Sequence, residues 1–442
     1  MNKPKVKVIA RRAADYGRAN RSEGLKIHKN TAPELHPMAQ QIEYVRAVKA
    51  AKMKKMFAKP LIGSLEAHED SVYSICRNHR DVRTVVSGGA DGNVCVWDLA
   101  ERTCLRKVKA HPMVVNDVTC DPHSDLILSV GADANICGFT ESASFAYVNP
   151  SGPLASIDFS YSEQQFVTGG KTLSIWSPTR NKPIQTFDVG TTNDFKDTVY
   201  NMNDTNLICA AAADRSIIIA DSRSRVVARR ITLAMQSNAV DWNPQAPNYF
   251  IAANDDSACY LFDIRKTESA VRVFTDHLGP VTCVNFSPNG KEFLTGSYDR
   301  TVRIWDWNNI KSKDCYHTKR MQRVFCCCVS PDSKFALSGS EDMSIRIFKT
   351  KANEELTVLS KKEEAARNMN ERLLKKYRYA PEVKSIAEKQ NLPKALHKQR
   401  YERARMMDAA NRKALARMAH SADPTQNKPE PLRVKRVIKD EA

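Results

Sequence analysis

Short apolar runs bounded by turn residues recur through the middle of the chain. Seven of them read VCVWDL, ICGFTE, LSIWSP, IIIADS, CYLFDI, VRIWDW and IRIFKT. Their shared aromatic position is occupied by Trp97, Phe139, Trp176, Ala220, Phe262, Trp305 and Phe348, with spacings of 42, 37, 44, 42, 43 and 43 residues. Short strands that repeat at this period predict an all-β propeller of seven blades, each with four strands.

A second position repeats in register with the first. Six residues before the aromatic position stand Asp91, Asp133, Asp214, Asp256, Asp299 and Asp342, and only the third repeat departs from this rule, with Gly170. An Asp in a tight turn between strands accepts hydrogen bonds from nearby backbone N–H groups. The repeated Asp is therefore interpreted as a turn residue within each blade.

The pattern resembles the WD40 repeat family, whose blades contain a hydrogen-bonded tetrad of His, Ser or Thr, the turn Asp and the Trp. The resemblance implies structural tetrads in blade 1 (His68, Ser87, Asp91, Trp97) and in blade 6 (His277, Thr295, Asp299, Trp305). Blades 3, 4 and 5 lack the His, and blade 4 also has Ala220 in place of the Trp. Those blades are expected to depend more on apolar packing.

Blade 7 needs an outer strand, and two segments are candidates for it. One is LIGSL, residues 61–65, directly before His68, and the other is ELTVL, residues 355–359. We favour 61–65, because WD40 propellers usually join their two ends in one blade.

The run Cys326-Cys327-Cys328 aligns with the inner strand of blade 6 and therefore predicts the inner strand of blade 7. Side chains alternate along a strand, so three consecutive cysteines cannot all face one metal ion. Free cysteine packs well as a small hydrophobe. The triplet is interpreted as core packing, and no metal site is expected there.

The two ends of the chain differ from the middle in composition. We predict a basic N-terminal arm at 1–60 with a short helix at 41–56, the propeller at 61–350, and a helical, basic extension at 351–442. Within the extension we expect two helical pieces divided at Pro381 and one long helix over 392–421, with a thin apolar stripe of Ala404, Met407, Ala414 and Met418. The tail 428–442 is too charged and Pro-rich to be expected in a core.

The net charge of +18 is concentrated in these ends. Residues 1–60 contain 15 Lys and Arg against 4 Asp and Glu, and residues 351–442 contain 23 against 13. The middle, 61–350, is nearly neutral, with 30 against 33. Two basic ends on a near-neutral body indicate a polyanionic partner, most simply a nucleic acid.

Several other functions have no support in the sequence. The stretch TGGKT at 168–172 looks like part of a phosphate loop, but the motif needs Gly where Gln165 stands. No apolar run is long enough to span a membrane. No nucleophile with a neighbouring base and no metal cluster stands out, so we expect no enzymatic activity, no cofactor and no small-molecule substrate.

A closer resemblance lies in the ends and in blade 7. LHP, EYVRAVKAAK, FAKP, YHTKRMQ and LPK resemble the suppressor-of-fibrillarin family of WD40 proteins. The resemblance implies a nuclear, nucleolar scaffold of the U3 small nucleolar ribonucleoprotein and small-subunit processome, bound to pre-rRNA and to other processome proteins, and required for pre-rRNA cleavage and 18S rRNA maturation. The candidate contacts with RNA or ribonucleoprotein are Lys319, Arg320 and Arg323 in blade 7 and Lys398, Arg400, Arg403, Arg405, Arg412, Lys413 and Arg417 in the last helix.

An alternative function belongs to a different class. Some WD40 proteins are substrate receptors of cullin-4 RING ubiquitin ligases and bind the ligase adaptor through a Trp-Asp-x-Arg box. The sequence FDIR resembles this box, with Phe262, Asp263, Arg265 and the upstream Asp256 as candidate adaptor contacts. ADSR, residues 220–223, resembles it less closely.

Overall fold

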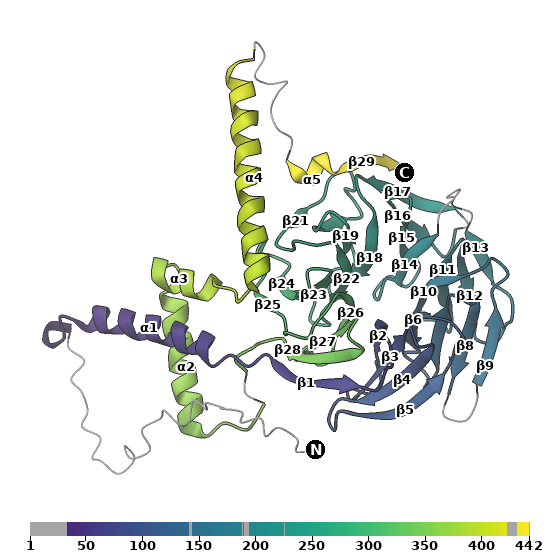
Figure 1. Cartoon of the computed structure of the whole chain (residues 1–442), viewed down its shortest axis with the longest axis horizontal. Coiled ribbons are helices and arrows are strands. Elements are labelled where there is room, and N and C mark those ends of the chain that lie inside the picture. The colour runs from purple at the N-terminus through teal and green to yellow at the C-terminus, as the bar shows by residue number, and fades with distance from the viewer. Residues whose placement is uncertain are drawn as a thin grey trace. The chain divides into compact units, whose positions relative to one another are not determined.

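Seven antiparallel sheets, one for each sequence repeat, are arranged around a common centre (Figure 1). The structure is a computed structural model that describes residues 33–140, 144–187, 189, 194–224, 226–354, 356–421 and 431–441. The N-terminal arm up to residue 32 lies outside these residues. The predicted seven-bladed propeller is confirmed, since the sheets follow one another in chain order.

The strands of each blade run outward from the centre in chain order. Blade 1 consists of β2 (Val72–Arg77), β3 (Thr84–Gly89), β4 (Asn93–Asp98) and β5 (Thr103–Lys109). Blade 2 consists of β6 (Val115–Cys120), β7 (Ile127–Gly131), β8 (Asn135–Phe139) and β9 (Ser144–Val148). Blade 3 consists of β10 (Leu154–Phe159), β11 (Phe166–Gly170), β12 (Leu173–Trp176) and β13 (Gln185–Phe187).

The remaining blades follow the same plan, with an extra strand in blade 4 and a displaced one in blade 7. Blade 4 contains β14 (Phe195–Tyr200), β15 (Leu207–Ala212), β16 (Ser216–Asp221), β17 (Val227–Leu233) and β29 (Val437–Glu441). Blade 5 contains β18 (Ser237–Trp242), β19 (Tyr249–Asn254), β20 (Cys259–Asp263) and β21 (Arg272–Phe274). Blade 6 contains β22 (Val281–Phe286), β23 (Glu292–Ser297), β24 (Val302–Asp306) and β25 (Asp314–Tyr316). Blade 7 contains β26 (Val324–Val329), β27 (Phe335–Ser340), β28 (Ser344–Lys349) and β1 (Leu61–Glu66).

The outer strand of blade 7 comes from the N-terminal side of the ring. β1 pairs antiparallel with β28, and Leu65 lies opposite Ile345. Leu65 is 1% exposed and belongs to the apolar cluster between blades 7 and 1. The preference for 61–65 is therefore confirmed. In the competing segment, residues 356–359 form no strand, and residue 355 lies outside the described residues.

The three consecutive cysteines lie in β26, the innermost strand of blade 7, as predicted. Cys326 and Cys328 are buried in the cluster shared with blade 1. Cys327 points the other way, and its sulfur lies 3.8 Å from the carbonyl oxygen of Leu294 in blade 6. The alternation places the thiols on both sides of the strand, in contact with both neighbouring blades.

Carboxylates on the inner strands bind the backbone of the next blade. The N–H of Ile157 donates to Asp117 over 3.0 Å and that of Val240 donates to Asp197 over 2.8 Å. The same interaction recurs between further blades: Asp158 accepts from Tyr200, Asp241 from Phe286, and Asn285 from Val329. Polar side chains on the inner strands thus connect blades 2 to 7 in sequence.

These carboxylates are half-buried around the central cavity, and their partial removal from solvent changes their acidity. Burial raises the pKa of Asp117 and Asp241 to about 6 and that of Asp197 to about 7. The pKa of Asp158 is raised as well, again chiefly by burial. In each case the backbone N–H groups oppose the increase by stabilising the charged form.

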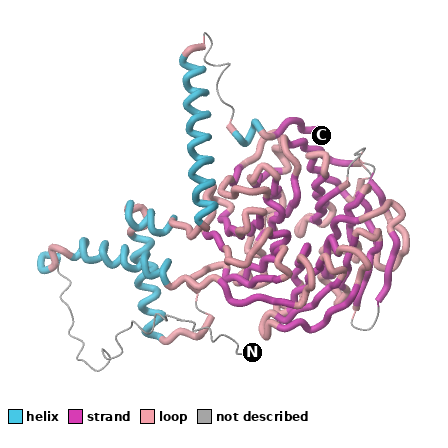
Figure 2. Tube along the Cα trace, in the orientation of Figure 1, coloured by secondary structure: helices cyan, strands magenta, loops and turns pink. Residues whose placement is uncertain are grey.

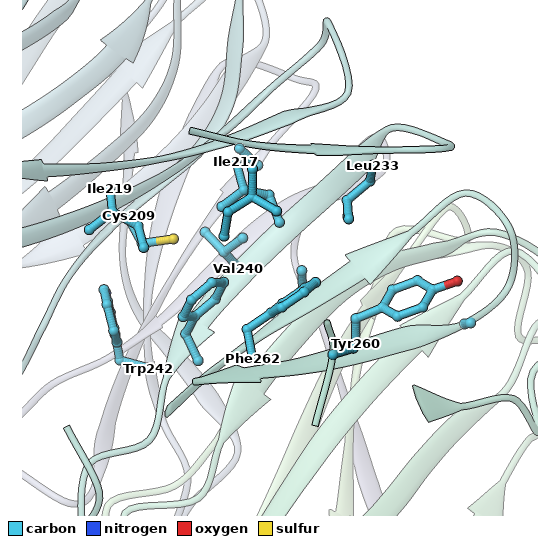
Figure 3. Close-up of a cluster of buried hydrophobic side chains, with 14 residues drawn as sticks. Cys209, Ile217, Ile219, Leu233, Val240, Trp242, Tyr260 and Phe262 are labelled. Carbon is cyan, nitrogen blue, oxygen red and sulfur yellow. The ribbon is translucent and has the colours of Figure 1, made fainter. Parts of the chain in front are cut away.

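The C-terminal tail forms the short helix α5 (Leu432–Lys435) and the strand β29, which corrects the expectation that it would join no core. β29 pairs antiparallel with β17 as the fifth strand of blade 4, with Ile231 opposite Asp440. Val437 packs against the buried cluster between blades 4 and 5 that Figure 3 shows. Blade 4 presents an open edge to which even a charged segment can add, because strand pairing satisfies backbone groups whatever the side chains.

The remaining helices have the predicted order, and Figure 2 separates them from the strands. They are α1 (Ala39–Met56), α2 (Lys361–Lys376), α3 (Pro381–Glu388) and α4 (Lys394–Ala419), with a short 3₁₀ turn at Pro33–Leu35. Contacts group residues 1–60 and 351–390 into one unit and the propeller with residues 391–442 into another. In the first unit, α1 buries Ala47, Val48 and Ala51 against α2 and α3, and Lys376 pairs with Glu43.

We predict that Leu65→Ala lowers the free energy of unfolding by about 2–5 kcal/mol, because it leaves a cavity where β1 closes blade 7. Leu356→Ala is the matched control: this side chain is 53% exposed, and its removal should change stability by less than about 0.5 kcal/mol. Chemical denaturation of both variants measures the difference. Equal destabilisation by the two substitutions would mean that 61–66 does not close the ring.

The raised pKa values of these half-buried carboxylates predict an unusual pH dependence of stability. The folded-state pKa of Asp197 lies above its unfolded value of about 3.9, so its contribution to stability is complete below pH 4 and is lost as the pH rises through about 7. Between about pH 5 and pH 8, Asp197→Asn should therefore lose about 1–3 kcal/mol less free energy of unfolding than the wild type. The exposed Asp81→Asn is the control, and an unchanged pH dependence in Asp197→Asn would contradict the assignment.

Candidate interaction surfaces on the propeller and the C-terminal helix

The structure contains the tetrad geometry in blade 1. The indole N–H of Trp97 donates to Ser87 Oγ over 2.7 Å, and His68 Nε2 lies 2.7 Å from the same oxygen. His68 Nδ1 is 3.3 Å from Asp91, whose other carboxylate oxygen accepts the N–H of Glu69. The four residues connect the third strand, the second strand and the turn between them to the segment that precedes the blade.

Blade 6 repeats this arrangement in a more buried form. Trp305 Nε1 donates to Thr295 Oγ1 over 2.8 Å, and His277 bridges from Thr295 at 2.7 Å to Asp299 at 2.9 Å. Burial acts to raise the pKa of Asp299, but His277 and the hydroxyl of Thr301 outweigh it and hold that pKa well below its usual range. Burial lowers the pKa of His277. The polar atoms of the tetrad residues are thus hydrogen-bonded to one another within the blade.

Other blades satisfy the turn Asp with different partners. In blade 2, His111 joins Ser129 and Asp133, while Phe139 stands where the Trp would donate. Arginines on the strands take over in two blades: Arg230 pairs with Asp214 in blade 4, and Arg346 pairs with Asp342 in blade 7. His317, which has the sequence spacing of a tetrad His, instead lies 3.1 Å from the carbonyl oxygen of Asn391, just before α4.

The tetrads identify one face of the ring. In blades 1, 2, 4, 5, 6 and 7, a backbone hydrogen bond joins the turn between the second and third strands to the segment that precedes the inner strand, for example from Ala90 to Ser71, from Tyr298 to Pro280 and from Glu341 to Arg323. We call the surface formed by these turns and segments the tetrad face.

The basic residues of blade 7 lie on the tetrad face, in the loop between β25 and β26. Lys319, Arg320 and Arg323 are exposed, whereas Met321 between them is buried and anchors the loop. The guanidinium of Arg323 lies over the ring of Tyr298 at 5.3 Å and within 3.9 Å of Glu341. The loop therefore presents positive charge to solvent next to an aromatic ring.

Helix α4 is rooted on the tetrad face at blades 5 and 6. Arg403 donates hydrogen bonds of 2.8 Å to Ser257 Oγ and to the carbonyl oxygen of His277. Arg400 lies 3.7 Å from Asp276, and Leu396 is buried. Two of the seven predicted RNA-binding cations thus serve to hold the helix on the ring.

The other cations of α4 are exposed. Lys398 lies 3.9 Å from Glu402, and Arg405 lies over the ring of Tyr401. Arg412, Lys413 and Arg417 are exposed along the half of the helix that is more distant in sequence from the docked residues. The predicted apolar stripe is only partly covered, since Ala404 and Met407 are exposed while Ala414 and Met418 are half-buried. The sequence alone could not distinguish the arginines that hold the helix on the ring from those that are exposed, because the spacing of both groups along the helix is similar.

The candidate adaptor box is divided between core and surface. Phe262 is fully buried in the cluster of Figure 3, and Asp263 accepts the backbone N–H of Arg265 over 3.0 Å. Arg265 itself is exposed. Asp256 accepts hydrogen bonds from Tyr260 Oη and from the N–H of Ala258.

The C-terminal segment lies beside this box. Arg436 is 3.5 Å from Asp256, and the hydroxyl of Thr267 donates to Asp440 over 2.5 Å. The N–H of Ala270 donates to the carbonyl oxygen of Arg433. Reasoning from sequence missed these contacts, because the tail is charged and Pro-rich like a solvated end. The alternation of polar and apolar residues around Val437 is the one feature that indicates a strand there.

The described residues offer little for metal or membrane chemistry. Among them, no group of three or more His, Cys, Asp or Glu side chains is arranged to hold a metal ion. None of the described helices is both long and apolar enough to cross a bilayer. A polar cavity of about 310 Å³ lies at the centre of the ring and is lined by the inner strands.

Two known protein families match the chain, one over the C-terminal extension and one over the propeller. The Sof1-like domain family matches residues 350–437, which contain α2 to α5. The WD domain, G-beta repeat family matches residues 59–98, 102–138, 268–306 and 313–349. These four repeats include both tetrad blades.

Whole-chain relatives extend this result. The chain is 37% identical over 426 residues to DDB1- and CUL4-associated factor 13 of Danio rerio, covering 94% of this chain and 95% of that protein. It is 34% identical to the protein of the same name from Homo sapiens, with the same coverage. It is 31% identical over 425 residues to Protein SOF1 of Saccharomyces cerevisiae, covering 89% of this chain and 87% of that protein. The family resemblance seen in the sequence is confirmed: the chain belongs to the Sof1 family of WD40-repeat proteins.

Proposed function

We propose that this protein is a non-enzymatic scaffold in ribosome biogenesis. In this role it is a nucleolar component of the U3 small nucleolar ribonucleoprotein and small-subunit processome, needed for pre-rRNA cleavage and 18S rRNA maturation. Membership of the Sof1 family supports the assignment, and so does the architecture of a ring with few open edges and many surface loops. In this role the ring holds binding partners in position, while the hydrogen-bonded tetrads stabilise the blades themselves.

One observation carries the proposal: α4 is held at one end and positively charged at the other. Arg400 and Arg403 bind the ring, whereas Arg405, Arg412, Lys413 and Arg417 are exposed. Between residues 404 and 419 the only acidic side chain is Asp408. A rigid basic helix fixed to a scaffold suits contact with the phosphate backbone, which any RNA sequence provides.

We predict that replacing Arg405, Arg412, Lys413 and Arg417 together with Gln flattens the salt dependence of RNA binding. For single-stranded RNA, the slope of log K against log salt should become less negative by about 0.7 for each phosphate that the helix no longer neutralises. The matched control exchanges the three arginines for Lys and Lys413 for Arg, and should keep most of the slope. Filter binding over a salt series measures the slopes, and thermal unfolding checks that the ring is intact.

The same variants test the cellular assignment. Purification of the tagged wild type from nucleolar extract should recover U3 RNA and pre-rRNA, and the Gln variant should recover less of both than the charge-preserving control. An absence of U3 RNA and pre-rRNA from the wild-type material would overturn the proposed function. Full recovery by the Gln variant would instead make α4 a protein-docking element.

A second candidate function is substrate recognition for a cullin-4 ubiquitin ligase. The relatives named DDB1- and CUL4-associated factor 13 favour it, and so does the exposed Arg265 at the end of the FDIR sequence. Adaptor binding would use the surface at β20 and β21, where Arg436 already contacts Asp256. Both functions involve blade 5, but Arg265 follows the end of β20 that is opposite to Ser257, which holds α4, so the two are compatible.

For this second function we predict that Arg265→Ala weakens binding to DDB1 by about tenfold or more, because a buried charged contact at an interface typically exceeds 1.4 kcal/mol. Arg223→Ala is the matched control, since Arg223 is also exposed and also stands two residues after an Asp, in the weaker ADSR sequence. Surface plasmon resonance with purified DDB1 gives both affinities. If the wild type shows no binding, or if both variants bind like it, the FDIR sequence is only part of a blade.

A further inference from the structure

Three aromatic rings from three different blades meet on the tetrad face. Tyr73 of blade 1 stacks on Phe325 of blade 7, with ring centroids 4.8 Å apart and planes at 13°. Tyr298, in the turn between β23 and β24 of blade 6, meets the same Phe325 edge-on at 6.0 Å. Tyr73 is 39% exposed and Tyr298 is 41% exposed. We call these three residues the aromatic platform.

The position of the platform follows from strand alternation. Tyr73 and Phe325 are the second residues of β2 and β26, and their neighbours Val72 and Val324 are fully buried between blades. The second residue therefore turns toward the central cavity, whose lining includes both rings. The other five second positions are Asn116, Ala155, Lys196, Asn238 and Thr282. Aromatic residues thus occupy this rim only at adjacent blades 7 and 1, and none of the seven positions is acidic.

Positively charged side chains lie beside the platform on blades 6 and 7. Arg323 lies over the Tyr298 ring at 5.3 Å, and Lys319, Arg320 and Arg300 are exposed in the same loop or the neighbouring turn. Three acidic side chains of this part of the face are paired: Glu341 lies 3.9 Å from Arg323, Asp342 pairs with Arg346, and Glu69 pairs with Lys107. Asp70 is exposed just before β2. Exposed rings among cations favour an anionic ligand with flat, apolar faces, and they disfavour a basic peptide, which the same cations would repel.

We propose that the aromatic platform is a binding site for unpaired bases of a single-stranded RNA. One base stacks on the outer face of Tyr298 and a second on Tyr73, while Lys319 and Arg320 contact the phosphates. Bases in a duplex keep their faces covered by neighbours, so stacking of this kind selects single strands or loops. This inference rests on the proposed function and deepens it by naming the form of RNA and its site.

The placement of α4 agrees with such a path. The base of α4 binds Ser257 in blade 5 and the carbonyl oxygen of His277 in blade 6, and the platform begins at Tyr298 in that same blade. A strand held by the exposed cations of α4 can continue across blade 6 to the platform. The helix then supplies sequence-independent charge, and the platform supplies preference for unpaired bases.

Binding of a fluorescein-labelled oligouridylate of about ten nucleotides to the full chain tests the proposal. Tyr73→Ala combined with Tyr298→Ala should weaken binding by about tenfold or more at every salt concentration and leave the salt slope unchanged. Tyr73→Phe combined with Tyr298→Phe keeps both rings and should bind like the wild type. Tyr379→Ala, which removes a ring that is 85% exposed elsewhere in the chain, is the second control.

A direct readout separates stacking from loss of fold. An oligonucleotide carrying 2-aminopurine should lose fluorescence on binding the wild type and the Phe variant, but not on binding the Ala variant. Equal affinity and equal quenching in the Ala variant would overturn the platform while leaving an RNA scaffold held by α4 intact. A flatter dependence of RNA affinity on salt in the Ala variant would also overturn the platform. The rings would then contribute by holding cationic side chains in place and not by stacking on bases. If the wild type binds no RNA and recovers no pre-rRNA, the proposed function fails as well.

Discussion

The hydrogen bonds between inner-strand carboxylates and the backbone of the next blade are the constraint on which the ring depends. Each blade satisfies its own backbone by strand pairing, but blades meet face to face and share no strand edges. Asp117, Asp158, Asp197 and Asp241 provide the directional contacts between them, whereas apolar packing between blades tolerates sliding. An amide left without its carboxylate would be buried and unpaired, at a cost of roughly 1–3 kcal/mol. These contacts align successive blades from blade 2 to blade 6.

Repetition is what made the blades predictable. The aromatic and Asp positions fixed seven repeats, and strand alternation then placed Cys326 and Cys327 on opposite sides of β26. The helices α1, α2 and α3 were also readable, because Pro381 divides the last two and apolar residues recur at helical spacing. Local signals of this kind need no knowledge of tertiary neighbours.

The features that could not be predicted from the sequence depend on tertiary contacts. β29 is charged, and it forms because β17 offers an edge in the right register, with Val437 packed against the apolar cluster between blades 4 and 5. Arg403 looks like the other arginines of α4 until Ser257 and His277 are placed beside it. His317 has the spacing of a tetrad residue, but it lies beside the carbonyl oxygen of Asn391, which comes after the last repeat. In each case the partner comes from another repeat or from beyond the repeats.

The fifth strand of blade 4 has a consequence for the order of synthesis. A chain leaves the ribosome N-terminus first, so β17 is complete long before β29 exists, and its outer edge stays open while blades 5, 6 and 7 are being made. In the same way, β1 has no strand to pair with until β28 has been synthesised. A nascent chain therefore carries two open strand edges that its own later segments must cover, and an open edge is a site for chaperone binding or for mispairing. Both edges are covered only after synthesis has passed β29.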